Sequence, residues 1–160
     1  MRTRHYLDCC PLIVRLFLLE EPMRTILQDP DSYACGVACT AMLAGVSYLD
    51  ASYQLFGDKK PRSTTTAQIR TALNEFGVAT PPRLQKLRPS STKFQKMEDA
   101  IRFVEHLERD ALLKMIRNDH PKGSWHWVVW DAKYRRIRNP LGDDRRKFRI
   151  TSYLEVLSRK

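Results

Sequence analysis

The hydrophobic positions that follow Cys35 predict two short helices with clear ends. Cys35–Leu43 is apolar on nearly every side and leads to Gly45, which favours a buried helix that stops at this glycine. Ser47 is suited to cap a second helix that runs to Phe56 and closes at the following glycine. The two segments therefore predict a pair of helices joined by a very short connection.

A third helix is expected directly after a polar loop. Either Thr65 or Thr66 can cap it, the segment Ala67–Phe76 presents one apolar face, and Gly77 ends it. The proline-rich segment 78–93 then reads as a connector whose flanks have room for a short strand. The first half of the chain is thus predicted to be helical.

The segment Phe94–Ile116 has apolar residues at helical intervals, which predicts a longer helix. Its last part, Ala111–Ile116, is apolar without a clear period and is equally compatible with a strand. Spacing alone does not decide between these two structures.

The remaining sequence predicts an antiparallel meander. Aromatic and β-branched residues make Ser124–Asp131 a strand, and a turn leads to a second strand at Arg136–Pro140. Another turn leads to Lys147–Ile150, after which Thr151 or Ser152 is suited to cap a final short helix through Leu157. Helices followed by such a meander define the α+β class.

The length of 160 residues fits one domain with its own core. We expect that domain to span residues 23–160. Residues 1–22 place basic residues ahead of an apolar stretch, but Arg15 interrupts the stretch and no small-residue cleavage site follows. They are interpreted as an appendage or an over-extended start before Met23, with an edge strand at Leu12–Leu19 as the alternative.

The formal net charge is +10, and residues 131–160 contribute ten Lys or Arg against four Asp or Glu. Such a surface favours phosphates, anionic lipid or acidic proteins, although the same residues also fit solvated hairpin edges. A nucleic-acid partner is therefore possible but not favoured. No apolar run approaches the length of a membrane span, so we expect none.

The four cysteines do not form a disulfide framework or a zinc site. Cys9 and Cys10 are neighbours, Cys35 and Cys39 are one helical turn apart, and no pair has the two-residue gap of a zinc knuckle. We therefore expect reduced thiols in a cytoplasmic protein, with no metal and no cofactor.

Cys35 is the candidate nucleophile. It begins a helix, where unpaired backbone N–H groups and the helix dipole favour a thiolate. Gly36 leaves room beside the sulfur for a substrate backbone, and Gln28 could offer its amide N–H to an oxyanion. The alternative is a small buried cysteine among small residues, which is how we interpret Cys39.

Of the four histidines, His126 is the best partner for a thiol. His5 lies in the doubtful leader, His106 in a charged segment and His120 before a proline. His126 opens an aromatic strand, and tryptophans on both sides of it can orient and shield an imidazole as acid–base chemistry requires. The alternative is a histidine satisfied within the core.

Asn139 is the candidate that orients His126. It follows across the predicted hairpin, and Pro140 would keep it extended at a strand end. Asp131 competes for this role, but strand alternation puts it on the opposite face from His126. If Asn139 has this role, we expect its oxygen to accept the Nδ1–H of the imidazole, leaving Nε2 to face Cys35.

Taken in order, these motifs resemble a known family. Gln28, the "CGVAC" of Cys35–Cys39, the "HWVVWD" of His126–Asp131 and the final "NP" are similar to the papain-like peptidases that cut bacteriocin leaders after a double glycine, and to their stand-alone bacterial relatives. The segments "GVSYLDA" and "STTTAQIRTALNEFGV" resemble the second and third helices of that family. The resemblance covers roughly residues 27–140.

The resemblance implies a papain-like fold and cleavage of an amide bond in a peptide or protein substrate. It implies Cys35 as nucleophile, His126 as general base and acid, Asn139 as the orienting residue and Gln28 as the oxyanion donor. Three positions depart from the usual pattern: Ala34 replaces an aspartate, Gln28 stands one residue further from the cysteine, and Asn139 is often aspartate. Since the sequence shows no transporter or nucleotide-binding motif, bacteriocin export is not carried over.

Overall fold

The fold is described from a computed structural model of the chain. The structure describes residues 23–29, 32–58, 60, 62–87, 93–118, 125–142 and 147–159. Several predictions lie outside these residues: the appendage 1–22 with its alternative strand Leu12–Leu19, and the placement of His5, Cys9, Cys10 and His120.

The three N-terminal helices form as their sequence signals predict. They are α1 (Cys35–Ala44), α2 (Tyr48–Phe56) and α3 (Thr66–Glu75). The helix α1 ends at Gly45 in the left-handed conformation that favours glycine, with φ of 68°. The hydroxyl of Ser47 caps α2, and Thr65 forms a reciprocal capping box with Gln68 at the start of α3. Local capping chemistry therefore sets these boundaries.

Within the described residues, seven strands form two antiparallel sheets. They are β1 (Val78–Ala79), β2 (Gln85–Lys86), β3 (Ala111–Arg117), β4 (His126–Asp131), β5 (Arg136–Arg138), β6 (Phe148–Glu155) and β7 (Ser158–Arg159). The larger sheet has the order β2-β6-β3-β4-β5, and β1 pairs with β7. The protein is therefore α+β, with helices first and an antiparallel sheet after them.

The long helix predicted over residues 94–116 is wrong, and the strand alternative for its last part is confirmed. Only the five residues of α4 (Met97–Ile101) are helical, and residues 102–106 form turns. The following β3 lies between β6 and β4, and both of its faces are covered. A strand buried on both faces has no polar–apolar alternation, which explains why its sequence also fits a helix.

The final helix predicted after Thr151 is also wrong. These residues continue β6, which pairs with β3 along Phe148–Glu155. Phe148, Ile150 and Leu154 are buried on β6, so long-range pairing with β3 prevails over the local cap signal. As a result, β6 crosses to the far side of β3 and the sheet is not a simple meander.

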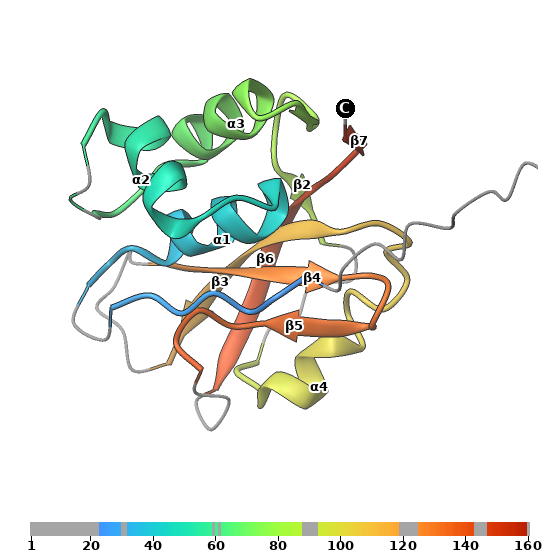
Figure 1. Cartoon of the computed structure of the whole chain (residues 1–160). Coiled ribbons are helices and arrows are strands. Elements are labelled where there is room, and N and C mark those ends of the chain that lie inside the picture. Colours follow the sequence, from blue (N-terminus) through green and yellow to red (C-terminus); the bar gives the residue numbers. More distant parts are fainter. Residues whose placement is uncertain are drawn as a thin grey trace, which may run out of the picture.

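The larger sheet has a different hydrophobic cluster on each face. The helices α1 and α3 lie over one face and α4 over the other (Figure 1). On one face, α1 and α3 pack through Cys39, Leu43 and Leu73 against Trp127 and other sheet residues. On the other face, α4 covers a cluster that includes Val128 and Trp130. Strand alternation along β4 therefore separates His126 from Trp127, as the sequence predicts.

Among the described helices, none is by itself long and apolar enough to cross a membrane. The helices α1 and α2 meet the length and composition criteria only when taken together, and they are bent by 112° relative to each other.

Candidate active site

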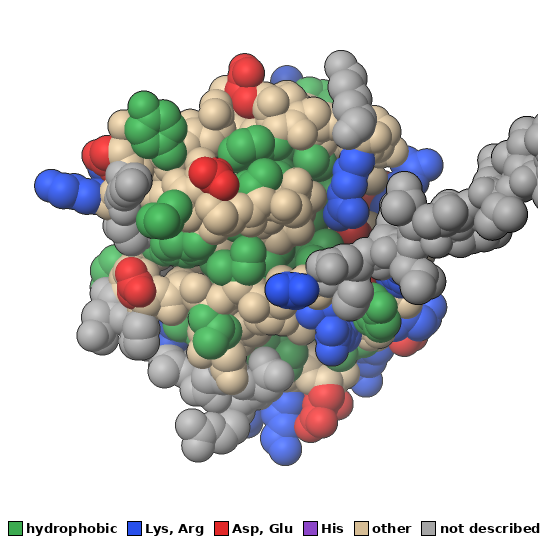
Figure 2. Space-filling view, in the orientation of Figure 1, with side chains coloured by type: hydrophobic (Ala, Val, Ile, Leu, Met, Phe, Trp, Pro, Cys, Tyr) green, Lys and Arg blue, Asp and Glu red, His purple; other side chains and the backbone are tan. Residues whose placement is uncertain are grey.

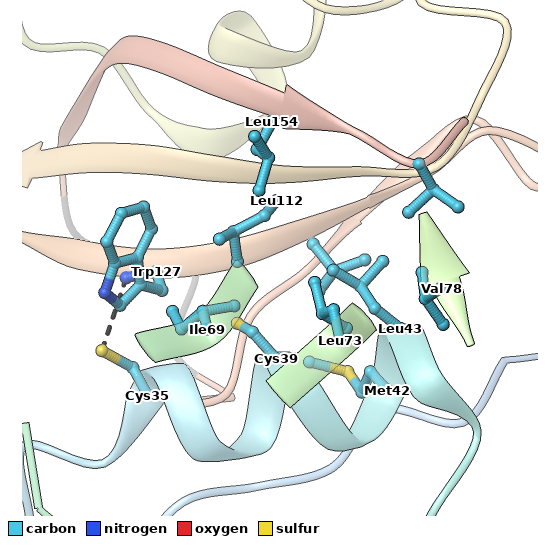
Figure 3. Packing of buried hydrophobic residues seen from close by; sticks show 12 residues of the cluster. Cys35, Cys39, Met42, Leu43, Ile69, Leu73, Val78, Leu112, Trp127 and Leu154 are labelled. Atoms are coloured by element: carbon cyan, nitrogen blue, oxygen red, sulfur yellow. Dashed lines mark hydrogen bonds between the residues drawn. The ribbon is translucent and has the colours of Figure 1, made fainter. Parts of the chain in front are cut away.

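Cys35 lies at the first position of α1, with its thiol against the start of β4. Its sulfur accepts a hydrogen bond from the backbone N–H of Trp127 at 3.4 Å, and its side chain is buried (Figure 3). The strand β5 pairs with β4 only from Val129 to Asp131. The thiol therefore contacts the first half of β4, which does not pair with β5. The helix start and the strand start therefore meet at the sulfur.

The electrostatics of the thiol combine two opposing effects. Burial raises the pKa of Cys35 above its ordinary value of 9.0, while the backbone N–H groups of Trp127, Gly36 and Cys35 itself and the charge of Arg117 lower it. Burial is the larger effect. The sequence predicts a thiolate favoured by the helix start, and the structure instead favours a neutral thiol in the resting protein.

His126 and Asn139 are joined directly. The Nε2 atom of His126 lies 2.9 Å from the Oδ1 atom of Asn139, and both side chains are buried. The same oxygen accepts the backbone N–H of Leu141 at 3.1 Å, which orients the amide. The imidazole also stacks against Phe148, with ring centroids 6.2 Å apart. These contacts fix the plane of the imidazole ring.

The ring nitrogen that contacts Asn139 differs from the one predicted. Because an amide oxygen only accepts, Nε2 of His126 carries the hydrogen of this bond. The expectation that Nδ1 bonds to Asn139 is therefore wrong, and Nδ1 is the nitrogen left for other chemistry. The orientation of the ring depends on where Asn139 lies in three dimensions, which cannot be read from the sequence.

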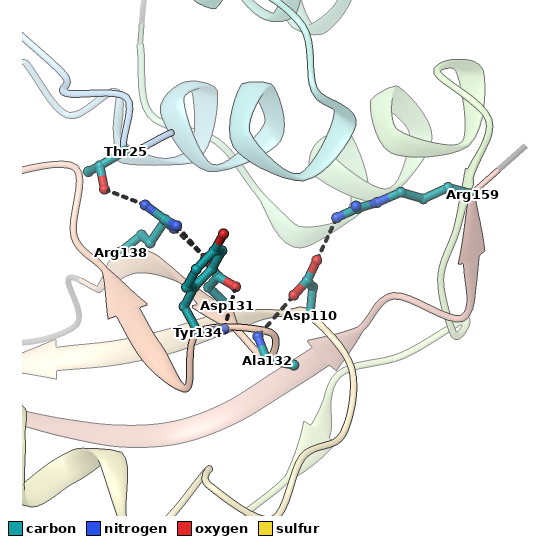
Figure 4. Close-up of polar contacts among 7 residues, drawn as sticks. All are labelled: Thr25, Asp110, Asp131, Ala132, Tyr134, Arg138 and Arg159. Carbon is teal, nitrogen blue, oxygen red and sulfur yellow. Dashed lines mark hydrogen bonds and ion pairs between the residues drawn. The ribbon is translucent and has the colours of Figure 1, made fainter. Parts of the chain in front are cut away.

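Asp131, the alternative to Asn139, is engaged elsewhere (Figure 4). Its carboxylate pairs with Arg138, whose Nε lies 2.7 Å away, and both side chains are almost fully buried. It also accepts the backbone N–H of Tyr134, and Arg138 donates to Thr25. Asp131 is therefore part of a buried structural ion pair that ties the β4–β5 hairpin to the N-terminal segment.

The backbone of Gln28 contacts Pro140, but its side chain turns toward the segment before α1. Its backbone N–H donates to the carbonyl of Pro140 at 3.0 Å. Its side-chain Nε2 donates to the carbonyl of Ser32, and its Oε1 is buried with no partner among the described residues. The amide expected to serve an oxyanion is thus already bound to backbone, with one N–H still available for another acceptor.

Two other buried polar atoms near the thiol have no hydrogen-bond partner among the described residues: Thr64 Oγ1 and Trp127 Nε1. The hydroxyl of Tyr48, also near the thiol, interacts with the side chain of Ser32. Burial, followed by the charges of Asp29 and Cys35, raises the pKa of Tyr48 to about 12, so its hydroxyl stays a donor. Together with Gln28 Oε1, these atoms surround the start of α1. Sequence reasoning gave neither Tyr48 nor Thr64 a role in the site, although both lie in the segments that resemble the second and third helices of the family.

Gly36 has a structural explanation different from the one expected. A Cβ atom at this position would lie 1.8 Å from Thr64 Oγ1 and 3.0 Å from Ile69 Cδ1. The glycine therefore allows α3 and the residue before its cap to pack closely against α1. The room predicted for a substrate backbone is occupied by the protein itself.

The remaining predictions for thiols and imidazoles are simpler. Cys39 is fully buried in the core, and His106 is exposed, as expected.

A cleft of about 820 Å³ lies between α4 and β5 and reaches Asn139; Met97, Ile101 and Ile137 contribute apolar surface to it. In the described part of the chain, no group of three or more His, Cys, Asp or Glu residues is arranged to hold a metal ion.

Comparison of the chain with models of protein families, with curated proteins and with solved structures gave no match. The geometry described above therefore carries the functional argument.

Proposed function

We propose that the protein is a papain-like cysteine peptidase, or a closely related amide hydrolase, that works through Cys35, His126 and Asn139. One observation carries this proposal. His126 bonds to Asn139 through Nε2, and the sulfur of Cys35 is held by the backbone N–H of the residue that follows His126. The consecutive residues His126 and Trp127 of β4 thus connect the imidazole–amide pair to the hydrogen bond of the thiol, which supports the proposal.

In the proposed reaction, Cys35 attacks the amide carbonyl while His126 accepts the thiol proton at Nδ1. The tetrahedral intermediate collapses to a thioester when the imidazolium returns that proton to the leaving amine. Water then attacks the thioester, again with His126 as base, and releases the acid and the thiol. Asn139 keeps the imidazole oriented through both steps and accepts the Nε2–H of the imidazolium.

Two donors are suited to the oxyanion in this proposal. The backbone N–H of Cys35 belongs to the start of α1, where N–H groups have no helical acceptor. The second N–H of the Gln28 amide can serve if the side chain moves or if it bonds to Ser32 and substrate together. Gln28 is therefore retained as a proposed oxyanion donor, although its contact with Ser32 makes its contribution smaller than that of a dedicated amide.

Alkylation by iodoacetamide, read by mass spectrometry, tests the proposal. We expect Cys35 to be labelled much faster than the fully buried Cys39, and His126→Ala to slow that labelling. Incubation of the wild type with a mixture of synthetic peptides should produce new termini, and Cys35→Ala should produce none. Equal labelling of the two thiols, with no effect of His126→Ala, would contradict a catalytic Cys35.

The first alternative is a non-catalytic module of the same fold that binds an anionic partner. Two features favour it: burial raises the pKa of the Cys35 thiol, and Lys133, Arg135 and Arg136 are exposed in the turn from β4 to β5. Lys and Arg side chains gather over this turn in Figure 2. Salt-dependent retention on heparin or DNA, unchanged in Cys35→Ala, together with no peptide cleavage, would favour this alternative.

The second alternative is acyl transfer to an amine by the same thiol. It differs from hydrolysis only in whether water or an amine reaches the thioester. Addition of a simple primary amine to the peptide reaction distinguishes them, because transfer yields a new amide whose mass includes the amine.

A further inference from the structure

Lys114 of β3 presents an ammonium group to two indole rings. Its Nζ atom lies 4.3 Å from the centroid of the Trp125 ring and 5.9 Å from that of Trp127. The two rings meet edge to face with their centroids 6.5 Å apart. In the part of the chain that the structure describes, no carboxylate pairs with this ammonium. The positive charge is therefore held by aromatic faces and not neutralised by an acid.

This ammonium and the Cys35 thiol both contact Trp127, the first at its ring and the second at its backbone N–H. Lys114 is the register partner of Trp127, so the two side chains share one face of the sheet. Trp127 belongs to the same buried cluster as Cys35, and its backbone N–H holds the sulfur at 3.4 Å. The charge of Arg117, on the same strand as Lys114, also acts on the thiol. Lys114, Trp125 and Trp127 thus form a positive and aromatic wall, and Trp127 of this wall also contacts Cys35 on the α1 face of the sheet.

The wall is open to a ligand. Trp125 is 39% exposed, and Lys114 is only partly buried. A carboxylate placed here would meet an ammonium whose charge is screened less than on an open surface, because two indoles displace water from it. An ammonium with no acidic partner among the described residues suits a carboxylate by charge complementarity, and the indole rings suit the apolar part of the ligand that carries this carboxylate.

We propose that Lys114 and Trp125 form the substrate subsite of the proposed peptidase and that this subsite binds a carboxylate close to the amide bond under attack. The inference rests on the proposed function for its reacting thiol. It adds the substrate class, which is a peptide that is acidic next to the cleavage point.

Paired alkylation rates with iodoacetate and iodoacetamide test the subsite without a known substrate. In both reactions the thiolate of Cys35 displaces iodide and forms an S–C bond, so the thiolate fraction cancels in the ratio of the two rates. The reagents are similar in size and differ in charge. We expect Lys114→Met to lower the iodoacetate-to-iodoacetamide ratio roughly three- to ten-fold at low salt, as the loss of one nearby charge implies. Lys114→Arg should preserve the ratio.

Lys86→Met is the matched control, because Lys86 is an exposed lysine on β2, at the opposite edge of the sheet from β5. This variant should leave the ratio unchanged. The wild-type ratio should fall as salt rises from about 0.01 M to about 1 M, where the screening length shrinks from about 30 Å to about 3 Å. An equal ratio in wild type, Lys114→Met and Lys86→Met overturns the subsite but leaves the peptidase proposal standing if iodoacetamide still labels Cys35 rapidly. Failure of both reagents to label Cys35 overturns both proposals.

Two protecting peptides distinguish the possible sources of the carboxylate. One is acetylated and amidated with a central glutamate, and the other is an acetylated triglycine with a free C-terminus. If the first peptide slows the labelling of Cys35 by iodoacetamide, the subsite binds an acidic side chain. If the second peptide slows this labelling, the subsite binds the carboxylate of a chain terminus. In either case Lys114→Met should abolish the protection, and protection that persists in this variant counts against the subsite.

Discussion

Asn139 illustrates how one side-chain oxygen serves two partners in the proposed site. Its Oδ1 atom accepts from His126 and from the backbone N–H of Leu141, and the residue is buried. Sequence position alone suggests a strand-end asparagine with few buried contacts. The two hydrogen bonds show instead that changing this residue affects both the imidazole and the local backbone, so stability and rate must be measured separately.

We predict that Asn139→Ala lowers peptide turnover by roughly one to several orders of magnitude per folded molecule, because the imidazole loses its orienting acceptor. It should also destabilise the protein by about 1–3 kcal/mol, since an N–H loses its partner. Asn139→Asp should keep most of the activity, because a carboxylate accepts the same hydrogens. The checks are turnover of a peptide that the wild type cleaves and urea unfolding of each variant. Full turnover by Asn139→Ala would remove this residue from the site.

The raised pKa of Cys35 leads to a prediction about pH. A thiol whose pKa is above 9.0 in the folded protein is protonated at neutral pH, so alkylation should accelerate as pH rises through and beyond that ordinary value. The unfolded chain loses this proton at lower pH than the folded chain. The contribution of Cys35 to stability is therefore fully present below the ordinary value and is lost as pH rises toward the folded value.

Iodoacetamide rates across the pH range provide the measurement, with urea unfolding at each pH as the companion. A thiolate–imidazolium pair at rest would instead give a rate that is already on its plateau by about pH 6. That result would show that the resting pair is charged, and that contacts to the thiolate outweigh its burial.

Gly36→Ala should be destabilising even though alanine favours helices. The added Cβ would lie 1.8 Å from Thr64 Oγ1 and 2.9 Å from Thr64 Cβ. Overpacking of this kind costs about 1–3 kcal/mol, against about 1 kcal/mol gained in helix propensity. Thr64→Ala removes the closest contact, so the double variant should be more stable than the sum of the two single changes predicts. Strictly additive unfolding free energies would mean that Gly36 and Thr64 do not approach as closely as described.

At the scale of elements, the hairpin of β4 and β5 depends on the buried pair of Asp131 and Arg138. Asp131→Ala leaves the guanidinium buried without its acid, which should cost about 3–5 kcal/mol of unfolding free energy. Asp131→Leu combined with Arg138→Met should recover much of that loss. The exposed pair of Arg159 and Asp110 is the control, and Arg159→Met should cost at most about 1 kcal/mol. If Asp131→Ala were as mild as Arg159→Met, the hairpin would not depend on this pair.

How well the sequence predicts a helix or strand depends on whether nearby residues or a distant segment determine that element. The starts of α2 and α3 depend on Ser47 and Thr65, whose hydroxyls bond within three residues, so local sequence is sufficient. The strand β6 depends on pairing with β3, which lies more than thirty residues earlier, and its Thr151 mimics a helix cap. Contacts between distant segments decide such cases, and a pattern read along the chain does not contain them.

The same distinction applies to the site. The type and order of Cys35, His126 and Asn139 could be predicted, because a helix start, a strand start and a strand end are local features. The nitrogen that faces Asn139, the bond from Gln28 to Ser32 and the packing of Gly36 against Thr64 could not, because each depends on a contact formed in three dimensions.

At the scale of the whole molecule, the C-terminal strand β7 joins the helical layer to the sheet. It pairs with β1, which directly follows α3, while the preceding β6 belongs to the large sheet (Figure 1). Leu157 donates its backbone N–H to Ala79, and Arg159 pairs with Asp110. The smaller sheet thus connects two parts of the chain that otherwise meet through the core around α1.

The last prediction tests this connection. A variant that ends at Val156 loses the β1–β7 pairing and the bond to Ala79, which together should lower the unfolding free energy by about 1–3 kcal/mol. The backbone bond from Val156 to Asp110 is retained, and so are Cys35, His126 and Asn139. We therefore expect a lower urea midpoint while iodoacetamide still distinguishes Cys35 from Cys39. Arg159→Ala in the full chain is the control, since it removes only an exposed ion pair and should change the midpoint little. An unchanged midpoint in the shortened variant would show that the core contacts of α1 hold the two layers together without β7. Loss of the difference between the two thiols would show instead that β7 supports the geometry of the site itself.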